Sequence, residues 1–206
     1  MQKESSSVLP LDKFAAFLFD LDGTLADSMG LHNRAWIQTL NDLGLIMTEE
    51  ILLEYVGISN VRTVDIFNRR FGWTLDPASV AQAKENKFFA DFDKMNPVEP
   101  VLNIAKSYQG QKPMAVVSGG SRAVVGRILK NLQIESLFQE RVCAEDTSRG
   151  KPFPDPFLRA ADLLKVQPSQ CLVFEDGEAG IRGAQACGMG VVRVAQNFSL
   201  TFLGEP

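Results

Sequence analysis

Two aspartates separated by one residue, Asp20 and Asp22, follow a short apolar run and precede Gly23. Buried carboxylates are costly unless something compensates their lost hydration. Side chains at positions i and i+2 of extended backbone point to the same side, so the two carboxylates share one environment. A divalent cation would compensate both, and magnesium, a hard ion, prefers oxygen ligands. The pattern therefore indicates a magnesium site, from which Gly23 lets the chain turn away sharply.

A calcium-binding loop or an ordinary polar turn would also place aspartates after a strand. The common calcium loop has further acidic residues and a terminal glutamate, which this segment lacks. This segment alone does not exclude an ordinary polar turn, because a short motif is a hypothesis until its context is known.

A hydroxyl and two glycines follow a second apolar run, in Ser118-Gly119-Gly120-Ser121, just before a helical stretch. A hydroxyl, backbone amides on flexible residues and a helix N-terminus together form a site for an anion. A serine that only caps the following helix would give a similar pattern, so this alternative stays open.

Further charged residues lie in two segments nearer the C-terminus. Lys151 is in the segment Arg149-Gly-Lys-Pro, which we interpret as a rigid and exposed loop. Its ammonium could balance negative charge on a transferring phosphate, although a loop lysine is most often only solvated. Glu175 and Asp176 end another apolar run and repeat the pattern of an acid at the carboxyl end of a strand.

Short apolar runs alternate with helical stretches over most of the chain, which predicts a parallel sheet covered on both faces. In doubly wound sheets the ligand cleft lies beyond the carboxyl ends of the strands, where the strand order reverses. With a strand order of 3-2-1-4-5, Asp20, Asp22 and Asp176 converge on one metal. The strands are expected at 14–19, 113–117, 142–144, 171–174 and 190–194, and the helices at 122–132, 156–165 and 179–187.

The segment from 29 to about 96 has helical periodicity and no convincing strand. Glycines at 44 and 72 are plausible helix ends, Thr48 is a plausible cap for a second helix, and residues 61–71 fit a third. Asp76-Pro77 fits the start of a fourth helix that runs to about residue 93. We therefore expect residues 29–95 to form a helical module inserted into a core of residues 1–28 and 96–206.

The composition argues against several classes of protein. Hydrophobic residues make up 45% of the chain, which is enough for a packed core, and the net charge is -4. An acidic chain is a poor candidate for nucleic acid as its main partner. Cys143, Cys171 and Cys187 form no CxxC pair, and we expect buried free thiols. With no apolar signal segment and no apolar run of about 20 residues, we expect a cytoplasmic monomer without a membrane partner.

Other common catalytic patterns are missing from the sequence. It contains one histidine, His32, and neither a G-x-S-x-G motif nor a P-loop. The glycines at 177, 180 and 183 have the wrong spacing for a dinucleotide-binding fingerprint.

Taken in order, four segments resemble the four motifs of the haloacid dehalogenase superfamily, and the helical module is similar to that family's four-helix cap. Asp27–Trp36 and Gly150–Phe157 resemble its β-phosphoglucomutase subgroup. Residues 99–118 resemble bacterial sugar-phosphate phosphatases of that subgroup, which act on fructose 1-phosphate and 6-phosphogluconate. The four matching segments are Asp20-Leu-Asp-Gly-Thr-Leu, Ser118 after its strand, Lys151-Pro152 and Glu175-Asp-Gly-Glu-Ala-Gly-Ile.

This resemblance implies a magnesium-dependent phosphatase that acts on a small sugar phosphate. Asp20 would attack phosphorus and form an aspartyl-phosphate. Asp22 would protonate the leaving oxygen and then deprotonate water, a switch that repulsion among crowded carboxylates would allow. An alternative with the same core is a β-phosphoglucomutase-type isomerase, in which the sugar takes the phosphoryl group back. A binding protein on an inactive enzyme fold is disfavoured, because every catalytic residue type is present.

The resemblance also implies which residues bind the phosphate and the metal. Ser118, with Gly119, and Lys151 would hold the phosphoryl oxygens. The magnesium ligands would be the Asp20 carboxylate, the Asp22 main-chain carbonyl and the Asp176 carboxylate, with Glu175 either a further ligand or a supporting partner.

Two residues of the helical module are weaker candidates for substrate contact. His32 matches a cap position of the subgroup at which a histidine helps set cap closure, although a lone helical histidine is often only packed or exposed. Arg62 could bind a distal phosphate or carboxylate, although surface arginines are usually only solvated. Trp36 fits the core of the module better than a substrate platform.

Overall fold

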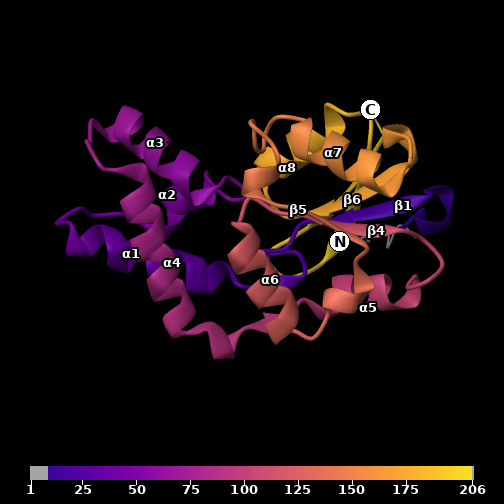
Figure 1. Cartoon of the computed structure of the whole chain (residues 1–206), viewed down its shortest axis with the longest axis horizontal. Helices are drawn as coiled ribbons and strands as arrows, with labels where there is room; N and C mark the ends of the chain where they lie inside the picture. Colours follow the sequence, from indigo (N-terminus) through magenta and orange to yellow (C-terminus); the bar gives the residue numbers. More distant parts are fainter. Residues whose placement is uncertain (1–8, 206) are drawn as a thin grey trace, which may run out of the picture.

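A computed structural model describes residues 9–205 of the chain. Within these residues the main sheet has the strand order β5-β4-β1-β6-β7-β8, in which β8 is antiparallel to β7 and the others are parallel. Along the chain, the five parallel strands have the order 3-2-1-4-5, so the predicted doubly wound fold is confirmed (Figure 1). The strands are β1 Ala16–Phe19, β4 Met114–Val117, β5 Glu140–Val142, β6 Cys171–Glu175, β7 Gly190–Val194 and β8 Leu200–Gly204.

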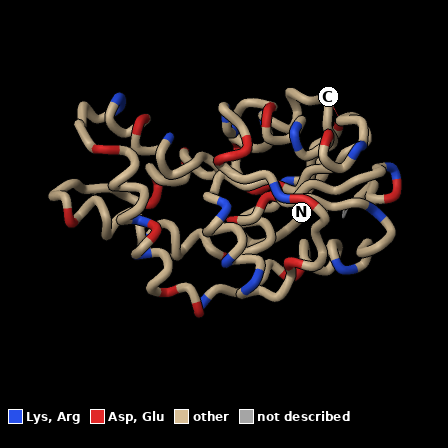
Figure 2. The backbone as a smooth tube through the Cα atoms, viewed as in Figure 1, with Lys and Arg blue, Asp and Glu red and all other residues tan. Residues whose placement is uncertain are grey.

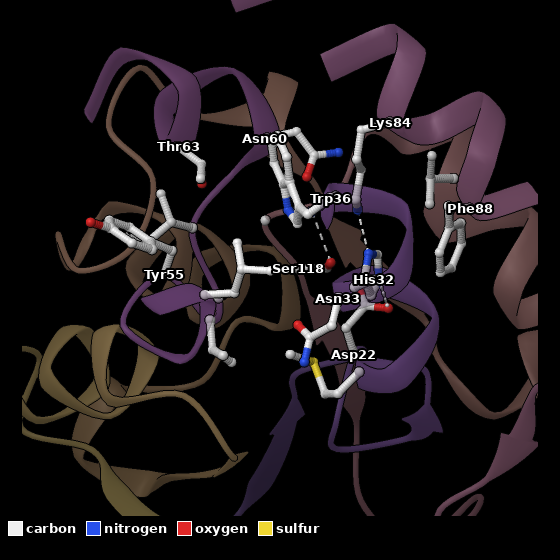
Figure 3. Close-up of a pocket in the computed structure, with 18 of the residues that line it drawn as sticks. Asp22, His32, Asn33, Trp36, Tyr55, Asn60, Thr63, Lys84, Phe88 and Ser118 are labelled. Atoms are coloured by element: carbon white, nitrogen blue, oxygen red, sulfur yellow. Dashed lines mark hydrogen bonds and ion pairs between the residues drawn. The ribbon is translucent and has the colours of Figure 1, made fainter. Parts of the chain in front are cut away.

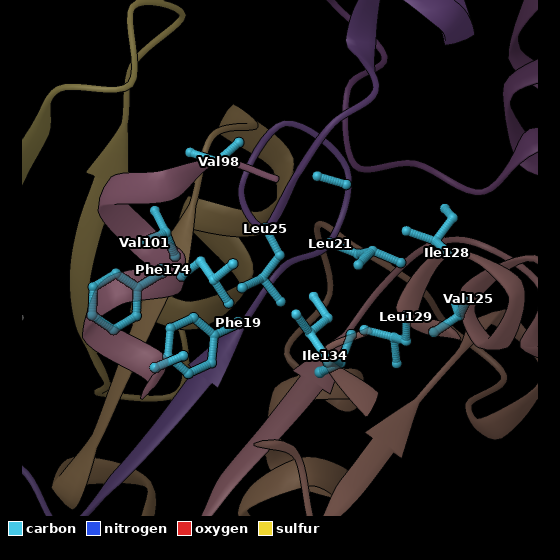
Figure 4. Packing of buried hydrophobic residues seen from close by; sticks show 14 of the residues in the cluster. Phe19, Leu21, Leu25, Val98, Val101, Val125, Ile128, Leu129, Ile134 and Phe174 are labelled. Atoms are coloured by element: carbon cyan, nitrogen blue, oxygen red, sulfur yellow. The ribbon is translucent and has the colours of Figure 1, made fainter. Parts of the chain in front are cut away.

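Helices cover both faces of this sheet. The helices α5 Glu99–Ser107 and α6 Arg122–Asn131 lie on one face, and α7 Asp155–Leu164 and α8 Glu178–Gln185 lie on the other (Figure 1). Successive side chains of β1 alternate between the two layers, and all four are buried, which explains why the strand reads as a continuous apolar run. Phe19 and Phe174 stack on each other in the hydrophobic layer between the sheet and the helices α5 and α6 (Figure 4).

The inserted segment contains four helices. These are α1 Met29–Asp42, α2 Glu49–Leu53, α3 Asn60–Phe71 and α4 Pro77–Ala90. The predicted end signals have the expected geometry: Thr48 accepts a hydrogen bond from Ile51 N, Asp76 accepts one from Ser79 N, and Gly72 ends α3 with a φ of 71°. The last helix ends at Ala90, before a 3-10 turn at Phe92–Lys94, and is therefore shorter than predicted.

We call this segment of helices the cap. A short two-stranded ribbon joins it to the core. The ribbon consists of β2 Ala26–Asp27 and β3 Asn96–Pro97, which pair in antiparallel fashion. The cap has its own hydrophobic cluster, in which Trp36 packs edge-to-face against Phe67 with ring centroids 5.6 Å apart. The boundaries at 28/29 and 95/96 stay a prediction, and they lie next to this ribbon.

Lysines and arginines are interspersed with aspartates and glutamates over both cap and core (Figure 2). The three cysteines are free thiols, and burial raises the pKa of each to about 11. Cys143 and Cys171 are buried, whereas Cys187 is half-buried, so the expectation of burial holds fully for only two of them. Among the described helices, none combines the length and the apolar character that crossing a membrane would require.

Candidate active site

The topology brings three motifs together at one edge of the sheet. The central strand β1 pairs with β4 on one side and with β6 on the other. Asp20 directly follows β1, Ser118 directly follows β4, and Glu175 is the last residue of β6. Since these strands are parallel, their carboxyl ends lie side by side, at the position where doubly wound folds bind ligands.

The Lys151 ammonium forms two ion pairs in this cluster, at 2.5 Å to Asp20 Oδ1 and 2.6 Å to Glu175 Oε2. The residue is 2% exposed, so the prediction of an exposed loop lysine is wrong. Two buried carboxylates compensate the ammonium, and backbone of the cap covers it: a Cβ atom on Gly57 would lie 3.6 Å from Lys151 Cδ. Although burial alone would lower the pKa of Lys151, Asp20 and Glu175 hold it above its ordinary value.

The carboxylates of Asp20, Glu175 and Asp176 offer oxygens that all lie within 4.8 Å of one another. Three carboxylates against the one ammonium of Lys151 leave two formal negative charges in a buried cluster. Burial, followed by the charge of Glu175, raises the pKa of Asp20 well above its ordinary value and that of Asp176 to about 8. This uncompensated negative charge and the all-oxygen donor set fit a hard divalent cation.

Two glycines allow the cluster to pack this closely. A Cβ atom on Gly23, whose φ is +82°, would lie 2.1 Å from Asp176 Oδ2. A Cβ atom on Gly180 would lie 2.0 Å from Glu175 Oε2. Since any side chain would displace a carboxylate, the two positions require glycine for steric reasons.

The Asp22 carboxylate lies outside this group of three and turns toward the cap. It accepts hydrogen bonds from Ser28 Oγ at 2.7 Å and from His32 Nε2 at 2.8 Å. Burial raises the pKa of Asp22, but His32 and Ser28 together lower it further, to about 2. Crowding therefore raises the pKa of Asp20 and Asp176 rather than that of Asp22, which differs from our expectation for this residue.

His32 is placed between Asp22 and a buried lysine of the cap, Lys84, whose Nζ contacts His32 Nδ1. Burial and the charge of Lys84 lower the pKa of His32. A neutral imidazole that accepts from Lys84 at Nδ1 donates from Nε2 to Asp22. The three side chains thus form a continuous chain from α4 of the cap to the core (Figure 3).

Ser118 and Gly119 meet the cap where the anion site was predicted. Ser118 is 6% exposed, and its Oγ accepts a hydrogen bond from Gly120 N at 3.0 Å. A Cβ atom on Gly119 would lie 2.9 Å from Gly57 O, so the cap backbone closes directly over this turn. Core and cap together line a cavity (Figure 3), which we call the central cavity. It is lined by Asp20, Asp22, Met29, His32, Asn33, Trp36, Leu52, Tyr55, Val56, Gly57, Ile58, Asn60, Thr63, Lys84, Glu85, Phe88, Ser118, Gly119, Gly120 and Val124.

Comparison with known proteins identifies the family. A family model described as haloacid dehalogenase-like hydrolase matches residues 14–188. The chain belongs to this family. It is therefore a haloacid dehalogenase-like hydrolase, as its four motifs predicted.

Curated relatives and a solved structure agree with this assignment. The hydrolase is 33% identical over 184 residues to fructose-1-phosphate phosphatase YqaB of Escherichia coli, which covers 89% of this chain and 97% of that protein. It is 29% identical over 189 residues to β-phosphoglucomutase of Bacillus subtilis, covering 88% and 83%. The crystal structure of β-phosphoglucomutase from Clostridium difficile superimposes with a TM-score of 0.76 at 26% identity, covering 88% and 85%. The hydrolase is thus an enzyme of the phosphatase or phosphotransferase type.

Arg62, the other cap candidate, does not line the central cavity of the hydrolase. It lines a neighbouring hollow that also reaches Ser118, Gly119 and Lys151. Its guanidinium lies 5.1 Å from the centroid of the Phe153 ring, and its buried Nε has no hydrogen-bond partner among the described residues. A direct contact between Arg62 and the substrate stays a prediction.

Sequence reasoning missed Lys84 and Glu85, which both line the central cavity. Lys84 is 1% exposed and packs over the rings of Trp36 and Phe88. The nearby Lys87 on the same helix instead pairs with Asp42 at the surface. Helical spacing alone does not show which of the two lysines is buried, because this depends on the residue of α1 that each one contacts, His32 for Lys84 and Asp42 for Lys87.

Proposed function

We propose that this hydrolase is a magnesium-dependent phosphatase that removes the phosphoryl group of a small sugar phosphate through an aspartyl-phosphate on Asp20. The observation that carries this proposal is the position of the Asp20 carboxylate. It is buried, paired with Lys151 and faces the central cavity beside Asp22 and Ser118. The name of the Escherichia coli relative, a fructose-1-phosphate phosphatase, supports a sugar phosphate as the substrate.

The charge and donor set of the acidic cluster support a magnesium site. Asp20 and Asp176, with the main-chain carbonyl of Asp22, would hold the ion. Both oxygens of Glu175 already accept hydrogen bonds, from Lys151 Nζ at 2.6 Å and from Gly177 N at 3.1 Å. Glu175 is therefore assigned as the partner that positions Lys151 rather than as a ligand. When bound, magnesium would neutralise negative charge on the phosphoryl oxygens.

In the first step the Asp20 carboxylate attacks phosphorus in line with the leaving oxygen. The new bond joins an Asp20 oxygen to phosphorus while the bond from phosphorus to the sugar oxygen breaks. Asp22 gives its proton to that sugar oxygen, which leaves as a hydroxyl. Lys151, the Ser118 hydroxyl and the backbone amides after β4 balance the charge of the phosphoryl oxygens.

In the second step water attacks the phosphorus of the aspartyl-phosphate. The Asp22 carboxylate accepts the proton of that water, inorganic phosphate leaves, and Asp20 is regenerated. With a pKa lowered to about 2 by His32 and Ser28 against the effect of burial, Asp22 is ionised in the free protein and so is in the form that can accept a proton. A bound phosphoryl dianion opposes the ionised form and so favours the protonated form that the first step needs.

A mutase is the second candidate, because β-phosphoglucomutases are among the relatives and solved structures. Both activities use the same core residues, and they differ in whether water or a sugar hydroxyl receives the phosphoryl group. The cap decides this by how well it excludes water from the central cavity.

A panel of phosphate esters, with phosphate release and sugar isomerisation measured in parallel, separates these candidates. Release of inorganic phosphate from fructose 1-phosphate or 6-phosphogluconate in the presence of magnesium would support the phosphatase. Conversion of β-glucose 1-phosphate to glucose 6-phosphate without phosphate release would support the mutase. Failure to act on any ester of a broad panel would contradict both.

A further inference from the structure

The central cavity is poor in cations on the side formed by the cap. Among the described residues that line it there is no arginine, and its one lysine is Lys84. Three carboxylates line the same cavity: Asp20 and Asp22 from the core, and Glu85 from α4 of the cap.

The Lys84 ammonium is already engaged in the series of side-chain contacts that leads through His32 to Asp22. The ammonium contacts His32 Nδ1, and His32 Nε2 lies 2.8 Å from Asp22 Oδ1. Glu85, the next residue, forms no ion pair with another described residue and accepts only a hydrogen bond from Asn60 Nδ2 at 3.4 Å. The charge of Lys84 acts on Glu85 without a direct ion pair, so the Glu85 carboxylate is only partly compensated and adds negative charge to the cap wall of the cavity.

The core wall has groups suited to one anionic group. Lys151 pairs with Asp20, and Ser118 lines the cavity with the two glycines that follow it, where its hydroxyl and their amides would hold the reacting phosphate. A second phosphate or carboxylate that extends into the central cavity would meet Glu85, and no arginine among the described lining residues could pair with it there, because Arg62 lines the neighbouring hollow.

The groups on the cap wall suit hydroxyls. Glu85 accepts hydrogen bonds, and Asn60 can both donate and accept. Asn33 is 9% exposed, and its carboxamide forms no hydrogen bond with another described side chain. Asn60 lies on the cap side of the cavity near Trp36, across from Asp22 and Ser118 (Figure 3).

We infer that Glu85 and Asn60 form a specificity site for an uncharged polyol or sugar tail. The site favours substrates whose only anionic group is the phosphate that is removed, and it binds bisphosphates and sugar-acid phosphates more weakly than these. This inference rests on the proposed phosphatase function and specifies its substrate class.

Sorbitol 6-phosphate and 6-phosphogluconate are a matched pair for the test, because they differ only in a terminal hydroxymethyl group or carboxylate. Each is measured as a competitor of p-nitrophenyl phosphate hydrolysis, so an inhibition constant is obtained whether or not the compound turns over. The variant Glu85→Gln removes the charge and keeps the shape of the side chain. Glu50→Gln, at an exposed position of α2, is the control with the same change in net charge.

We expect the unaltered hydrolase to bind sorbitol 6-phosphate about tenfold more tightly than 6-phosphogluconate, the order of the repulsion between two like charges in contact that water largely screens. Glu85→Gln should reduce this preference at least threefold through tighter binding of the acid, and Glu50→Gln should leave it unchanged. Equal binding of the two compounds by the unaltered hydrolase, or equal effects of the two variants, would overturn the specificity site. Loss of the proposed function has a different signature, since p-nitrophenyl phosphate would then not be hydrolysed at all.

Discussion

Lys151 is the one cation within hydrogen-bonding distance of the buried carboxylates Asp20 and Glu175 among the described residues. Its side chain is 1% exposed, so solvent does not screen these ion pairs. Removing one partner of a buried ion pair leaves the other partner charged and unsolvated, which costs far more than losing a pair at the surface. The stability of the site therefore depends on this lysine as much as the chemistry does.

We predict that Lys151→Met lowers the free energy of unfolding by about 3 kcal/mol, because two buried carboxylates lose their counter-charge. The same variant should lose roughly two orders of magnitude in kcat, because a donor to the phosphoryl oxygens is missing. Chemical denaturation and steady-state kinetics measure the two effects. Lys106→Met, at an exposed position of α5, is the control and should change neither quantity. Unfolding of Lys151→Met at the same denaturant concentration as the unaltered protein would contradict this role.

The buried Lys84 should make the stability of the protein depend on pH. Burial lowers its pKa from the ordinary 10.5 to about 8, so the side chain is still an ammonium at pH 7 but loses its proton at a lower pH in the folded protein than in the unfolded chain. Between pH 8 and 10.5 the unfolded chain binds more protons at this site than the folded chain does, and stability must therefore rise with pH across this window. The penalty for burying the charge is present below pH 8 and is gone above pH 10.5.

We predict that Lys84→Met removes this rise. The free energy of unfolding of the unaltered protein, relative to that of the variant, should increase by roughly 3 kcal/mol between pH 8 and 10.5. Denaturant titrations of both proteins across this range give the difference. A constant difference, or one that falls with pH, would show that Lys84 is not buried as a charged group.

At the scale of single elements, α8 approaches β6 so closely that its glycine positions are not equivalent to other helical glycines. A Cβ atom on Gly180 would overlap the Glu175 carboxylate, whereas one on Gly126 of α6 would have Arg141 as its nearest neighbour at 3.7 Å. In open helical positions alanine is favoured over glycine by about 1 kcal/mol, since it restricts the unfolded chain.

Gly180→Ala and Gly126→Ala should therefore change stability in opposite directions. We expect Gly126→Ala to raise the free energy of unfolding by about 0.5–1 kcal/mol. Gly180→Ala should lower it and reduce activity, because the displaced Glu175 carboxylate releases Lys151. Thermal unfolding of the two variants tests this, and stabilisation by both would disprove the close packing of α8 on the site.

The elements that could be predicted from the sequence are those whose burial gives a simple hydrophobic pattern along the chain. The strands β1, β4, β6 and β7 are buried on both faces and read as apolar runs. Their alternation with helices predicts a parallel sheet but does not by itself give the strand order 3-2-1-4-5. The edge strand β8 alternates between half-buried and exposed residues and was not predicted. Core motifs were found by their place after strands, whereas Lys84 and Glu85 owe their roles to partners distant in sequence.

At the scale of the whole molecule, cap and core have separate hydrophobic clusters and share the central cavity. Both tryptophans, Trp36 and Trp73, belong to the cap or pack against its cluster. Tryptophan fluorescence therefore reports on the cap, while the acidic cluster belongs to the core. Tryptophan fluorescence can therefore be used to follow the stability of the cap.

Phe67 is fully buried at the centre of the cap cluster, where its ring contacts Trp36, Tyr55 and Trp73. We predict that Phe67→Ala lowers the denaturant midpoint of the fluorescence transition by an amount equivalent to about 3–5 kcal/mol, through the cavity that it leaves. Leu53→Ala, at a position 46% exposed, is the control and should have little effect. If the two variants had equal midpoints, Phe67 would not be a core residue of the cap.

The central claim is that Asp20 carries the phosphoryl group. Borohydride reduces an acyl phosphate of aspartate to homoserine, so reduction after rapid quenching of the enzyme during turnover, followed by peptide mass spectrometry, identifies the modified residue. We predict homoserine at position 20, formed only with substrate and magnesium, and none in Asp20→Asn, which should fold normally and be inactive. Full turnover by Asp20→Asn, or homoserine at another aspartate, would contradict the account.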